Sequence, residues 1–338
     1  MGVRLAVVGA TGAVGELMRQ VLEERRFPVE SIRFLASSKS ANRSIHFAGK
    51  EYTVQEVTPE AFQGVQIVLS STPASISRHW SLIAAQMGAI VIDNSSAWRM
   101  DPEVPLVVPE VNAKDLQSIP KGIIANPNCS TIQMVVALKP LYQISRIKRV
   151  IVATYQASSG KGAKGVNELD AQIRALGQNG PIPVATAHAG TLAGNVLTMD
   201  WKLGDDGYTE EEIKMIKETQ KIMGDEQIRV SPTCARVAVR SGHSEAINVE
   251  FETPVSVEQA KNALRQAPGV VLVEENNPTG LQPLHVAGQD HTFVGRIRQD
   301  PSCAHALNLW VVADNLRKGA ATNAVQIAQE LLKIKKWA

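Results

Sequence analysis

Cysteine is scarce in this chain: three of 338 residues are cysteines, and they stand far apart, at Cys129, Cys234 and Cys303. This number and spacing exclude a disulfide framework and a zinc cluster built on cysteine ligands. We therefore expect no metal site. Unpaired thiols fit a reducing compartment, so we expect a cytoplasmic protein.

The chain also lacks an excess of charge of either sign and lacks long apolar runs. Its formal net charge is +2, which gives no reason to expect nucleic acid or an anionic membrane as a partner. No uninterrupted apolar stretch approaches the roughly 20 residues that a membrane-spanning helix needs. The N-terminal residues run directly into a predicted strand, so we expect no signal peptide. A length of 338 residues suits two domains of ordinary size.

The first third of the chain alternates predicted strands and helices. Strands are predicted at residues 3–8, 32–36, 65–70, 89–93 and 123–125, and helices at 16–24 and 75–87. A further helix is predicted to start at Thr58-Pro59-Glu60, with Thr58 as its N-cap. Because the strands are apolar almost throughout, they predict a parallel sheet with helices on both faces.

Beyond residue 130 the pattern changes. Strands are predicted at residues 149–154, 235–239, 246–251, 270–273, 292–298 and 306–312. Several alternate apolar and polar residues, which predicts a mixed or antiparallel sheet with one face covered by helices at 210–223 and 256–267. Residues 177–194 are predicted to be a loop, and 315–335 one long helix. The predicted fold class is α/β: a Rossmann-type nucleotide-binding domain plus an α+β domain with a mixed sheet.

Cys129 is the residue most suggestive of chemistry. It follows the apolar run at 123–125 and precedes a helical stretch at 132–138, so it stands at a strand-to-helix turn. Unpaired backbone N–H groups at a helix N-terminus lower a thiol pKa and stabilise an oxyanion. The alternative is a buried cysteine that packs as a small apolar residue.

A glycine-rich turn at the first strand–helix junction predicts a nucleotide site. Gly9, Gly12 and Gly15 follow the spacing G-x-x-G-x-x-G, which lets a pyrophosphate approach the backbone. The second strand ends in Ser37, Ser38, Lys39 and Ser40 instead of an acidic residue. Hydroxyls and a cation suit a 2′-phosphate, so NADP is favoured, although an ordinary solvated loop and dual specificity stay open.

Motifs along nearly the whole chain closely resemble those of bacterial aspartate-β-semialdehyde dehydrogenases. They are residues 9–15, 93–96 with Arg99, 109–112, 126–133, 155–157, 242–245 and 314–320. The resemblance implies NADP-dependent, phosphate-dependent interconversion of aspartate semialdehyde and aspartyl phosphate, on the route to lysine, threonine and methionine. It also implies a homodimer or homotetramer.

The resemblance assigns roles residue by residue. Cys129 matches the nucleophile, His243 the acid/base, and Gln156 the residue that orients the nucleophile and the substrate. Arg236 matches the group that binds the substrate carboxylate, and Glu218 the one that binds its ammonium. Phosphate is assigned to the positions of Arg99, Lys221 and Asn128. The cofactor residues implied are Gly9, Thr11, Gly12, Ala13, Val14, Ser37, Lys39, Ser40, Ser159, Gly160 and Asn315.

Because Asn315 precedes the predicted C-terminal helix, we expect a discontinuous NADP-binding domain of residues 1–128 and 315–338. Residues 129–314 are expected to form the catalytic and dimerisation domain. The chain departs from the family pattern at 157–200, where an aromatic residue and a Pro-His pair are missing and Lys161 is added. Two alternatives stay open. One is a related reductase acting on another acyl phosphate, such as N-acetylglutamyl phosphate, and the other is a non-catalytic paralogue.

Overall fold

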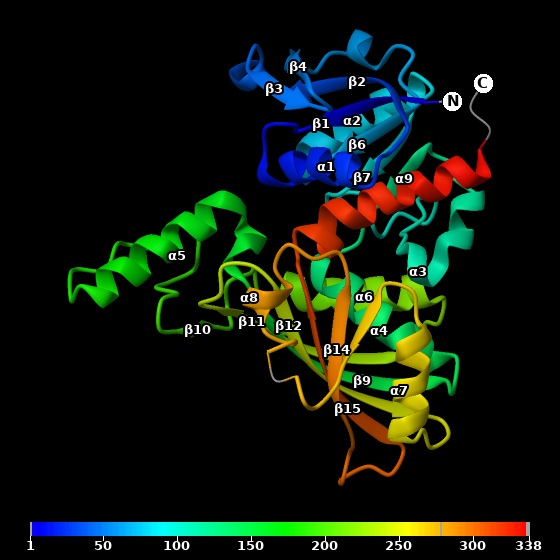
Figure 1. Ribbon diagram of the computed structural model, residues 1–338, viewed down its shortest axis with the longest axis vertical. Helices are drawn as coiled ribbons and strands as arrows, with labels where there is room; N and C mark the ends of the chain where they lie inside the picture. Colours follow the sequence, from blue (N-terminus) through cyan, green and yellow to red (C-terminus); the bar gives the residue numbers. More distant parts are fainter. Residues whose placement is uncertain (1, 278, 336–338) are drawn as a thin grey trace. The chain divides into compact units, whose positions relative to one another are not determined.

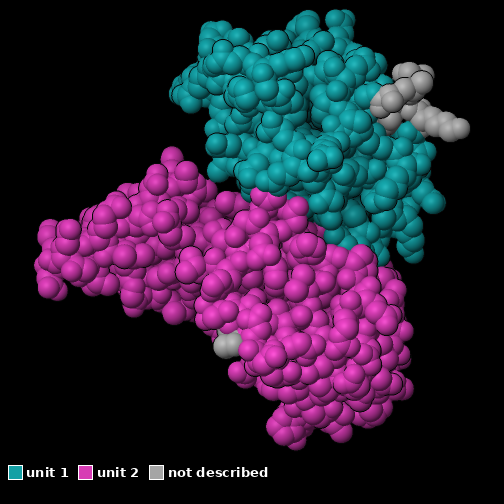
Figure 2. Space-filling view, viewed as in Figure 1, with its two compact units in different colours: residues 1–127, 320–338 teal, residues 128–319 magenta. Residues whose placement is uncertain are grey.

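The computed structural model describes residues 2–277 and 279–335, and these fall into two compact units. Unit 1 comprises residues 1–127 and 320–338, and unit 2 comprises residues 128–319 (Figure 2). The ends of the predicted first domain, residue 1 and residues 336–338, lie outside the described residues. Each unit is built around its own sheet.

Unit 1 contains a parallel sheet in the order β5-β2-β1-β6-β7-β8 (Figure 1). Counted along the chain, the order is 3-2-1-4-5-6, that of a Rossmann-type fold. The sheet is therefore the parallel α/β sheet predicted from the apolar strands. Its strands are β1 (Val3–Val8), β2 (Val29–Ala36), β5 (Gln55–Glu56), β6 (Ile67–Ser70), β7 (Ile90–Asp93) and β8 (Ile123–Ala125).

Helices of unit 1 bury their apolar sides against this sheet. The core joins side chains of β1, α1 and α9, including Val7, Met18 and Ala324, all with essentially no exposure. The α-helices are α1 (Ala13–Glu24), α2 (Ala74–Gln86), α3 (Pro109–Asn112) and α9 (Thr322–Ile334). The unit also has the 3-10 helices η1 (Ser38–Ser40), η2 (Pro59–Phe62) and η3 (Ala113–Gln117), and a hairpin of β3 (Ser44–Phe47) and β4 (Lys50–Thr53).

Two local predictions for unit 1 are wrong. Helix α1 begins at Ala13, not residue 16, because the helix starts inside the glycine-rich turn, directly after Gly12. Thr58 makes no side-chain capping bond, and the segment after it is the single 3-10 turn η2 instead of an α-helix. Because η2 has only four residues, it forms no second turn that a capping bond could stabilise.

Unit 2 contains a mixed sheet in the order β10-β11-β9-β12-β15-β14-β13. Parallel pairs join β11 to β9 and β13 to β14, and the other neighbours are antiparallel. The mixed sheet confirms the predicted α+β character of this half. Its strands are β9 (Ile147–Gln156), β10 (Val196–Leu197), β11 (Arg229–Val237), β12 (His243–Phe251), β13 (Val270–Val273), β14 (Thr292–Gln299) and β15 (Ala306–Ala313).

One face of this sheet is covered by helices, which Figure 1 shows behind the strands. Burial alternates along β9: Val152, Thr154 and Gln156 are buried, whereas Ile151 and Tyr155 are exposed. The buried residues face α4, which contacts β9, β14 and β15. All helices that belong to unit 2, whichever face they lie on, are α4 (Cys129–Tyr142), η4 (Ser158–Lys161), α5 (Gly162–Gly177), α6 (Glu210–Met223), α7 (Val257–Gln266) and α8 (Pro283–Val286). The π-helical η5 (Arg317–Ala321) begins in unit 2 and ends in unit 1.

One strand of unit 2 and the tail helix differ in extent from their predictions, and one helix of unit 2 was not predicted. The strand expected at 235–239 is β11, which spans Arg229–Val237. Pro232 obscured it, and it is tolerated because β10 pairs only with Arg236 and Val237, which leaves that side of β11 open at Pro232. The predicted tail helix is interrupted by η5, so α9 begins at Thr322. The 16-residue helix α5 was not predicted because glycines occupy its first turn and its end.

Candidate active site

The glycine-rich loop of unit 1 connects β1 to the N-terminus of α1. A Cβ at Gly9, whose φ is +79°, would lie 2.2 Å from the carbonyl oxygen of Ser71, at the end of β6. At Gly15 a Cβ would lie 2.3 Å from the oxygen of Gly9. The loop therefore packs too closely for side chains at these positions. Helix α1 starts directly after this loop, and its N-cap Gly12 has no side chain that could bond the first amides of the helix.

The residues proposed for the 2′-phosphate follow β2, the strand beside β1. Ser37 precedes the 3-10 turn Ser38–Ser40, and its carbonyl oxygen accepts bonds from the amides of Ser40 and Ala41. Ser37 and Lys39 are exposed. A hydroxyl and a cation thus stand at the carboxyl end of β2, where the adenosine ribose lies in Rossmann-type folds.

Arg99 lies in the segment after β7 and is only 8% exposed. Its Nε donates to the carbonyl oxygen of Asn126 at 3.0 Å, and its Nη2 donates to that of Asn94 at 3.1 Å. Both acceptors are backbone atoms at the ends of neighbouring strands. These two bonds hold the guanidinium at the carboxyl edge of the unit 1 sheet.

Cys129 is the first residue of α4, which places the thiol at a helix N-terminus, as the sequence predicts. Asn128 is the N-cap: its Oδ1 accepts from the amides of Ser130 at 3.0 Å and Thr131 at 3.3 Å. Asn128 is the last residue of the short turn between β8 and α4. Its capping bonds fix the direction in which α4 starts, and therefore the position of Sγ of Cys129.

His243, at the start of β12, faces this thiol. Its Nε2 lies 3.3 Å from Sγ of Cys129, and its Nδ1 accepts from the backbone N–H of Ala157 at 3.0 Å. The ring is fully buried, and burial, followed by the positive charge of Arg236, lowers the pKa of His243 well below its usual value. The neutral imidazole therefore carries its proton on Nε2 and directs it at the thiol.

Gln156 and Asn128 are joined through a residue that sequence reasoning missed. Oε1 of Glu211 accepts from Nδ2 of Asn128 at 2.9 Å and from Nε2 of Gln156 at 3.1 Å. Glu211 is 4% exposed, in the first turn of α6. Acidic residues in a first turn are ordinary helix-dipole partners, so nothing in the sequence set this carboxylate apart from Glu210 and Glu212.

Glu218 is also buried beside the start of α4. It is 1% exposed, and its Oε2 accepts from the backbone N–H of Asn128 at 2.6 Å. Lys221 follows three residues later, in the last turn of α6. Glu218 is therefore a core residue, whereas Lys221 is half-buried. The structure thus brings Cys129, Asn128, Glu218, Gln156 and His243 together within unit 2.

Arg236, on β11, is 2% exposed and held by protein atoms. Nε donates to Oδ2 of Asp200 at 2.9 Å, Nη1 donates to the oxygen of Ala157 at 2.7 Å, and the guanidinium lies 4.6 Å from the centre of the Trp201 ring. These contacts fix the plane of the Arg236 guanidinium. Nη2 has no hydrogen-bond partner among the described residues, so it and the second Nη1 hydrogen are available for a carboxylate.

Asp200 connects Arg236 to residues 157–200, the segment in which the chain departs from the family pattern. Its carboxylate accepts from His188 Nδ1 at 3.2 Å and from the Ala189 amide at 2.9 Å, and it lies 3.6 Å from Lys161 Nζ. Burial opposes ionisation, but the bonds from Arg236, Ala189 and His188 outweigh it and lower the pKa of Asp200. Lys161 therefore pairs with Asp200. Sequence reasoning gave Asp200 no role.

Ser159, Gly160 and Asn315 lie together near this cluster. Oδ1 of Asn315 accepts from the Ser159 hydroxyl and from the Gly242 amide, both at 3.0 Å. A Cβ at Gly160 would lie 2.8 Å from Nη1 of Arg236, which accounts for glycine there. Asn315 therefore joins the loop before His243 to the loop after Gln156.

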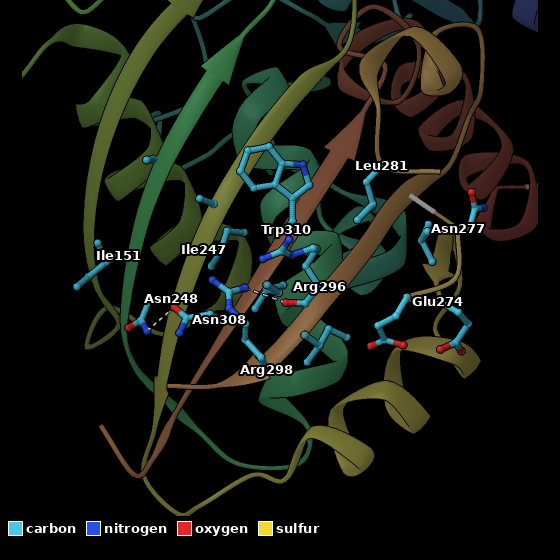
Figure 3. A pocket seen from close by; sticks show the side chains of 16 residues that line it. Ile151, Ile247, Asn248, Glu274, Asn277, Leu281, Arg296, Arg298, Asn308 and Trp310 are labelled. Carbon is cyan, nitrogen blue, oxygen red and sulfur yellow. Dashed lines mark hydrogen bonds between the residues drawn. The ribbon is translucent and has the colours of Figure 1, made fainter. Parts of the chain in front are cut away.

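The other face of the unit 2 sheet carries a cavity of about 1060 Å³. Ile151, Asn248, Asn308 and Trp310 line it from the strands, and Arg296 and Glu274 stand at its side (Figure 3). These side chains point away from α4, so this cavity is separate from Cys129. In the described part of the chain, no helix is long and apolar enough to cross a membrane, and no group of three or more His, Cys, Asp or Glu residues could hold a metal ion.

Two family patterns match this chain. The semialdehyde dehydrogenase NAD-binding domain matches residues 4–119, and the semialdehyde dehydrogenase dimerisation domain matches residues 138–318. Cys129 lies in the short segment between the two matches. Together the matches cover most of both structural units.

Individual relatives match over almost the full length. An aspartate-semialdehyde dehydrogenase of Aquifex aeolicus is 52% identical over 337 residues, which cover 98% of this chain and 99% of the relative. The crystal structure of aspartate semialdehyde dehydrogenase II from Vibrio cholerae, complexed with ASA, is 46% identical with a TM-score of 0.95, covering 98% of this chain and 99% of that one. The Candida albicans enzyme, solved with NADP, is 25% identical with a TM-score of 0.77, covering 98% and 99%.

Proposed function

The chain belongs to the aspartate-semialdehyde dehydrogenase family and is an oxidoreductase of amino-acid biosynthesis; from this we propose that it interconverts L-aspartate 4-semialdehyde plus phosphate and L-4-aspartyl phosphate through a thioester on Cys129. The observation that carries this proposal is the 3.3 Å contact between Cys129 Sγ and His243 Nε2 at the N-terminus of α4.

In the oxidative direction the Cys129 thiolate adds to the aldehyde carbon, which forms a C–S bond and a thiohemiacetal oxygen. Loss of hydride from that carbon and of a proton from that oxygen gives the thioester, with His243 as acid/base at the oxygen. A phosphate oxygen then attacks the thioester carbon, and the C–S bond breaks to return the thiolate. In the reductive direction, Nε2–H of His243 faces the developing oxyanion as a donor.

NADP is the proposed cofactor. When bound, it supplies the hydride acceptor or donor. The loop fits it because the backbone at Gly9 and Gly15 leaves no room for side chains and presents amides, with Thr11, Gly12, Ala13 and Val14, at the start of α1. Ser37, Lys39 and Ser40 would hold the 2′-phosphate, and Ser159, Gly160 and Asn315 the nicotinamide end. Lys39→Glu should lower activity with NADP more than with NAD.

The substrate and phosphate are assigned by charge. The free hydrogens on Nη1 and Nη2 of Arg236 suit the substrate α-carboxylate, and buried Glu218 suits its ammonium group. Arg99 and Lys221 supply cations for phosphate, and Asn128 an amide. Gln156, tied to Asn128 through Glu211, would orient the substrate carbonyl.

We further propose a homodimer that buries the outer face of the unit 2 sheet. That face exposes Ile151 and Tyr155, and the half-buried Trp310 lies beside Tyr155 with ring centres 5.3 Å apart. A two-fold dimer covers the same patch on both copies. Trp310→Glu should give monomers in analytical ultracentrifugation, whereas Ile76→Glu, on exposed α2, should not.

One assay tests the main proposal. Protein, aspartate semialdehyde and NADP should give absorbance at 340 nm only when phosphate or arsenate is present, and replacement of NADP by NAD should lower the rate. Cys129→Ala is the control. Equal rates for Cys129→Ala and the parent protein would contradict the thioester. A thiol proposed to work as a free nucleophile also requires a reducing compartment, so the cytoplasm is the proposed location.

A further inference from the structure

A row of four hydrogen-bonded side chains leads through the interior of unit 2 to Arg236. Oγ of Ser158 lies 2.8 Å from Nε2 of His188, and Nδ1 of His188 donates to Oδ2 of Asp200 at 3.2 Å. The same carboxylate oxygen accepts from Nε of Arg236 at 2.9 Å. Each of the four residues is at most 5% exposed. The row therefore connects a histidine that has no assigned role to the guanidinium proposed to bind the substrate.

The serine at the far end of the row cannot act as a nucleophile. Serine, histidine and aspartate joined in this order are also the groups of a hydrolase triad. Here Ser158 has no exposed surface, and its amide donates to the carbonyl oxygen of Val239 at 2.7 Å. Helix α5 packs closely over the pair, because a Cβ at Gly165 would lie 3.2 Å from Nε2 of His188. A substrate could not reach the hydroxyl, so its bond to His188 orients the imidazole.

The backbone around His188 is held at two points. Glu168 of α5 accepts from the amide of Ala187 at 2.7 Å and from the amide of His188 at 3.1 Å. On the other side, the amide of Ala189 donates to Oδ1 of Asp200 at 2.9 Å. These bonds place the His188 ring against Asp200, so the imidazole can fix the carboxylate that it touches.

The carboxylate of Asp200 is in turn the group that sets the orientation of Arg236. Its Oδ2 receives both the His188 and the Arg236 bonds, so rotation of the carboxylate would break both. The second support of Arg236 is the carbonyl oxygen of Ala157, and the amide of Ala157 donates to Nδ1 of His243. With Nε and one Nη1 hydrogen bound in this way, the outer edge of the guanidinium points in one direction.

We propose that His188 is a positioning residue: by donating to Asp200 it holds the Arg236 guanidinium in the orientation that binds the α-carboxylate of the amino-acid substrate. Because His188 acts through Asp200 on Arg236, its loss should weaken substrate binding more than it slows the reaction at Cys129. This inference rests on the proposed substrate-binding role of Arg236. It gives the segment at 157–200 a function in substrate recognition.

Two conservative variants separate the two bonds of His188. In His188→Asn the amide nitrogen takes the place of Nδ1, so it can donate to Asp200 but cannot reach Ser158. In His188→Gln the amide takes the place of Nε2, which keeps the Ser158 contact and loses the Asp200 bond. His188→Leu removes both bonds. The matched control is Gln172→Leu, because buried Gln172 of α5 accepts from the amides of Leu192 and Ala193 and holds the same loop at another point.

Kinetics with separate KM values for aspartate semialdehyde and phosphate test the proposal, and thermal unfolding verifies folding. We expect His188→Leu and His188→Gln to raise the KM for aspartate semialdehyde about tenfold, with kcat and the KM for phosphate within about twofold of the parent protein. His188→Asn should restore most of the loss, and Gln172→Leu should leave both KM values unchanged. An equal rise in both KM values, no rescue by asparagine, or the same effect in Gln172→Leu would overturn the proposal.

A second measurement does not depend on the identity of the substrate. Nitrogen-15 NMR of labelled arginine reports on solvent exchange of the Arg236 Nε–H, whose signal is assigned by its absence in Arg236→Lys. Exchange should be faster in His188→Leu and His188→Gln than in the parent protein and in His188→Asn. Equal exchange in all four proteins would overturn the positioning role. If this ranking holds in a protein that does not oxidise aspartate semialdehyde, the positioning of Arg236 stands and the proposed substrate is wrong.

Discussion

The backbone N–H of Ala157 donates to Nδ1 of His243, and this bond decides which ring nitrogen faces Cys129 with a proton. A neutral imidazole has one N–H, so Nε2 carries it here. An imidazolium would need a proton on Nδ1 as well, and the Ala157 bond would have to break. The same bond must open before Nε2 can accept a proton from a thiohemiacetal.

We predict that His243 stays neutral from about pH 6 to 8 and gives kcat no acidic limb in that range. Burial and the charge of Arg236 lower its pKa well below 6.5. Since the unfolded chain binds the proton more readily, the stability contributed by neutral His243 is complete above about pH 6.5 and is lost as pH falls below it. Nitrogen-15 NMR of labelled histidine should show a protonated Nε2 at pH 7. A signal of the doubly protonated ring at pH 7 would contradict this, and the exposed His46 is the internal reference.

Asn128→Asp should separate helix capping from catalysis. Aspartate still caps α4, so the cap itself should be kept, and any loss in the free energy of unfolding should come from the charge placed beside buried Glu211. The variant loses the Nδ2–H that binds Glu211 and adds a negative charge beside it, so kcat should fall about tenfold or more. Asn128→Ala, which removes both functions, should lower stability by about 0.5–2 kcal/mol. Unchanged kcat in Asn128→Asp would remove Asn128 from the site.

Arg236→Lys should weaken binding of aspartate semialdehyde more than binding of phosphate, because a lysine ammonium cannot bind Asp200, Ala157 and a substrate carboxylate in one plane. Asp200→Asn should also weaken binding of aspartate semialdehyde more than binding of phosphate, but by a smaller factor. This change removes the charged partner of the Arg236 guanidinium and leaves the guanidinium itself in place. Separate KM values for the two substrates give the ranking. The reverse order would assign Arg236 to phosphate and Arg99 to the amino-acid substrate.

Asp225→Asn should reduce the acid sensitivity of folding. Asp225, just after α6, accepts from Arg146 at 2.8 Å and from the Tyr142 hydroxyl at 2.9 Å. Arg146 is the main cause that lowers the pKa of Asp225. The stability it contributes is therefore complete above about pH 4 and is lost as pH falls through the lower native pKa. The free energy of unfolding, measured by denaturant melts, should differ less between pH 7 and pH 3 for Asp225→Asn than for the parent protein. The control is Glu330→Gln, which removes the surface pair Lys333–Glu330 and should leave that difference as it is in the parent protein.

Local pattern was sufficient for several elements of the fold. The helix predicted at 210–223 has the limits of α6, which the structure closes with the capping box of Thr209 and Glu212 and with Gly224, and the strand predicted at 270–273 is β13. In both, a strong local preference and the final environment agree. Pro232 in β11 and the glycines of α5 misled prediction, because pairing and packing outweighed local propensity there.

The sequence by itself determined the class of protein: the spacing of glycines after β1 and the motifs around Cys129 and His243 depend on neighbours in the chain. Only the tertiary structure decided what surrounds these residues. Glu211 and Asp200 reach the site from a separate helix and a separate loop, and no spacing in the chain connects them to it. Burial gives them their chemistry, because a carboxyl without exposed surface is charged or neutral according to the few groups that fold against it.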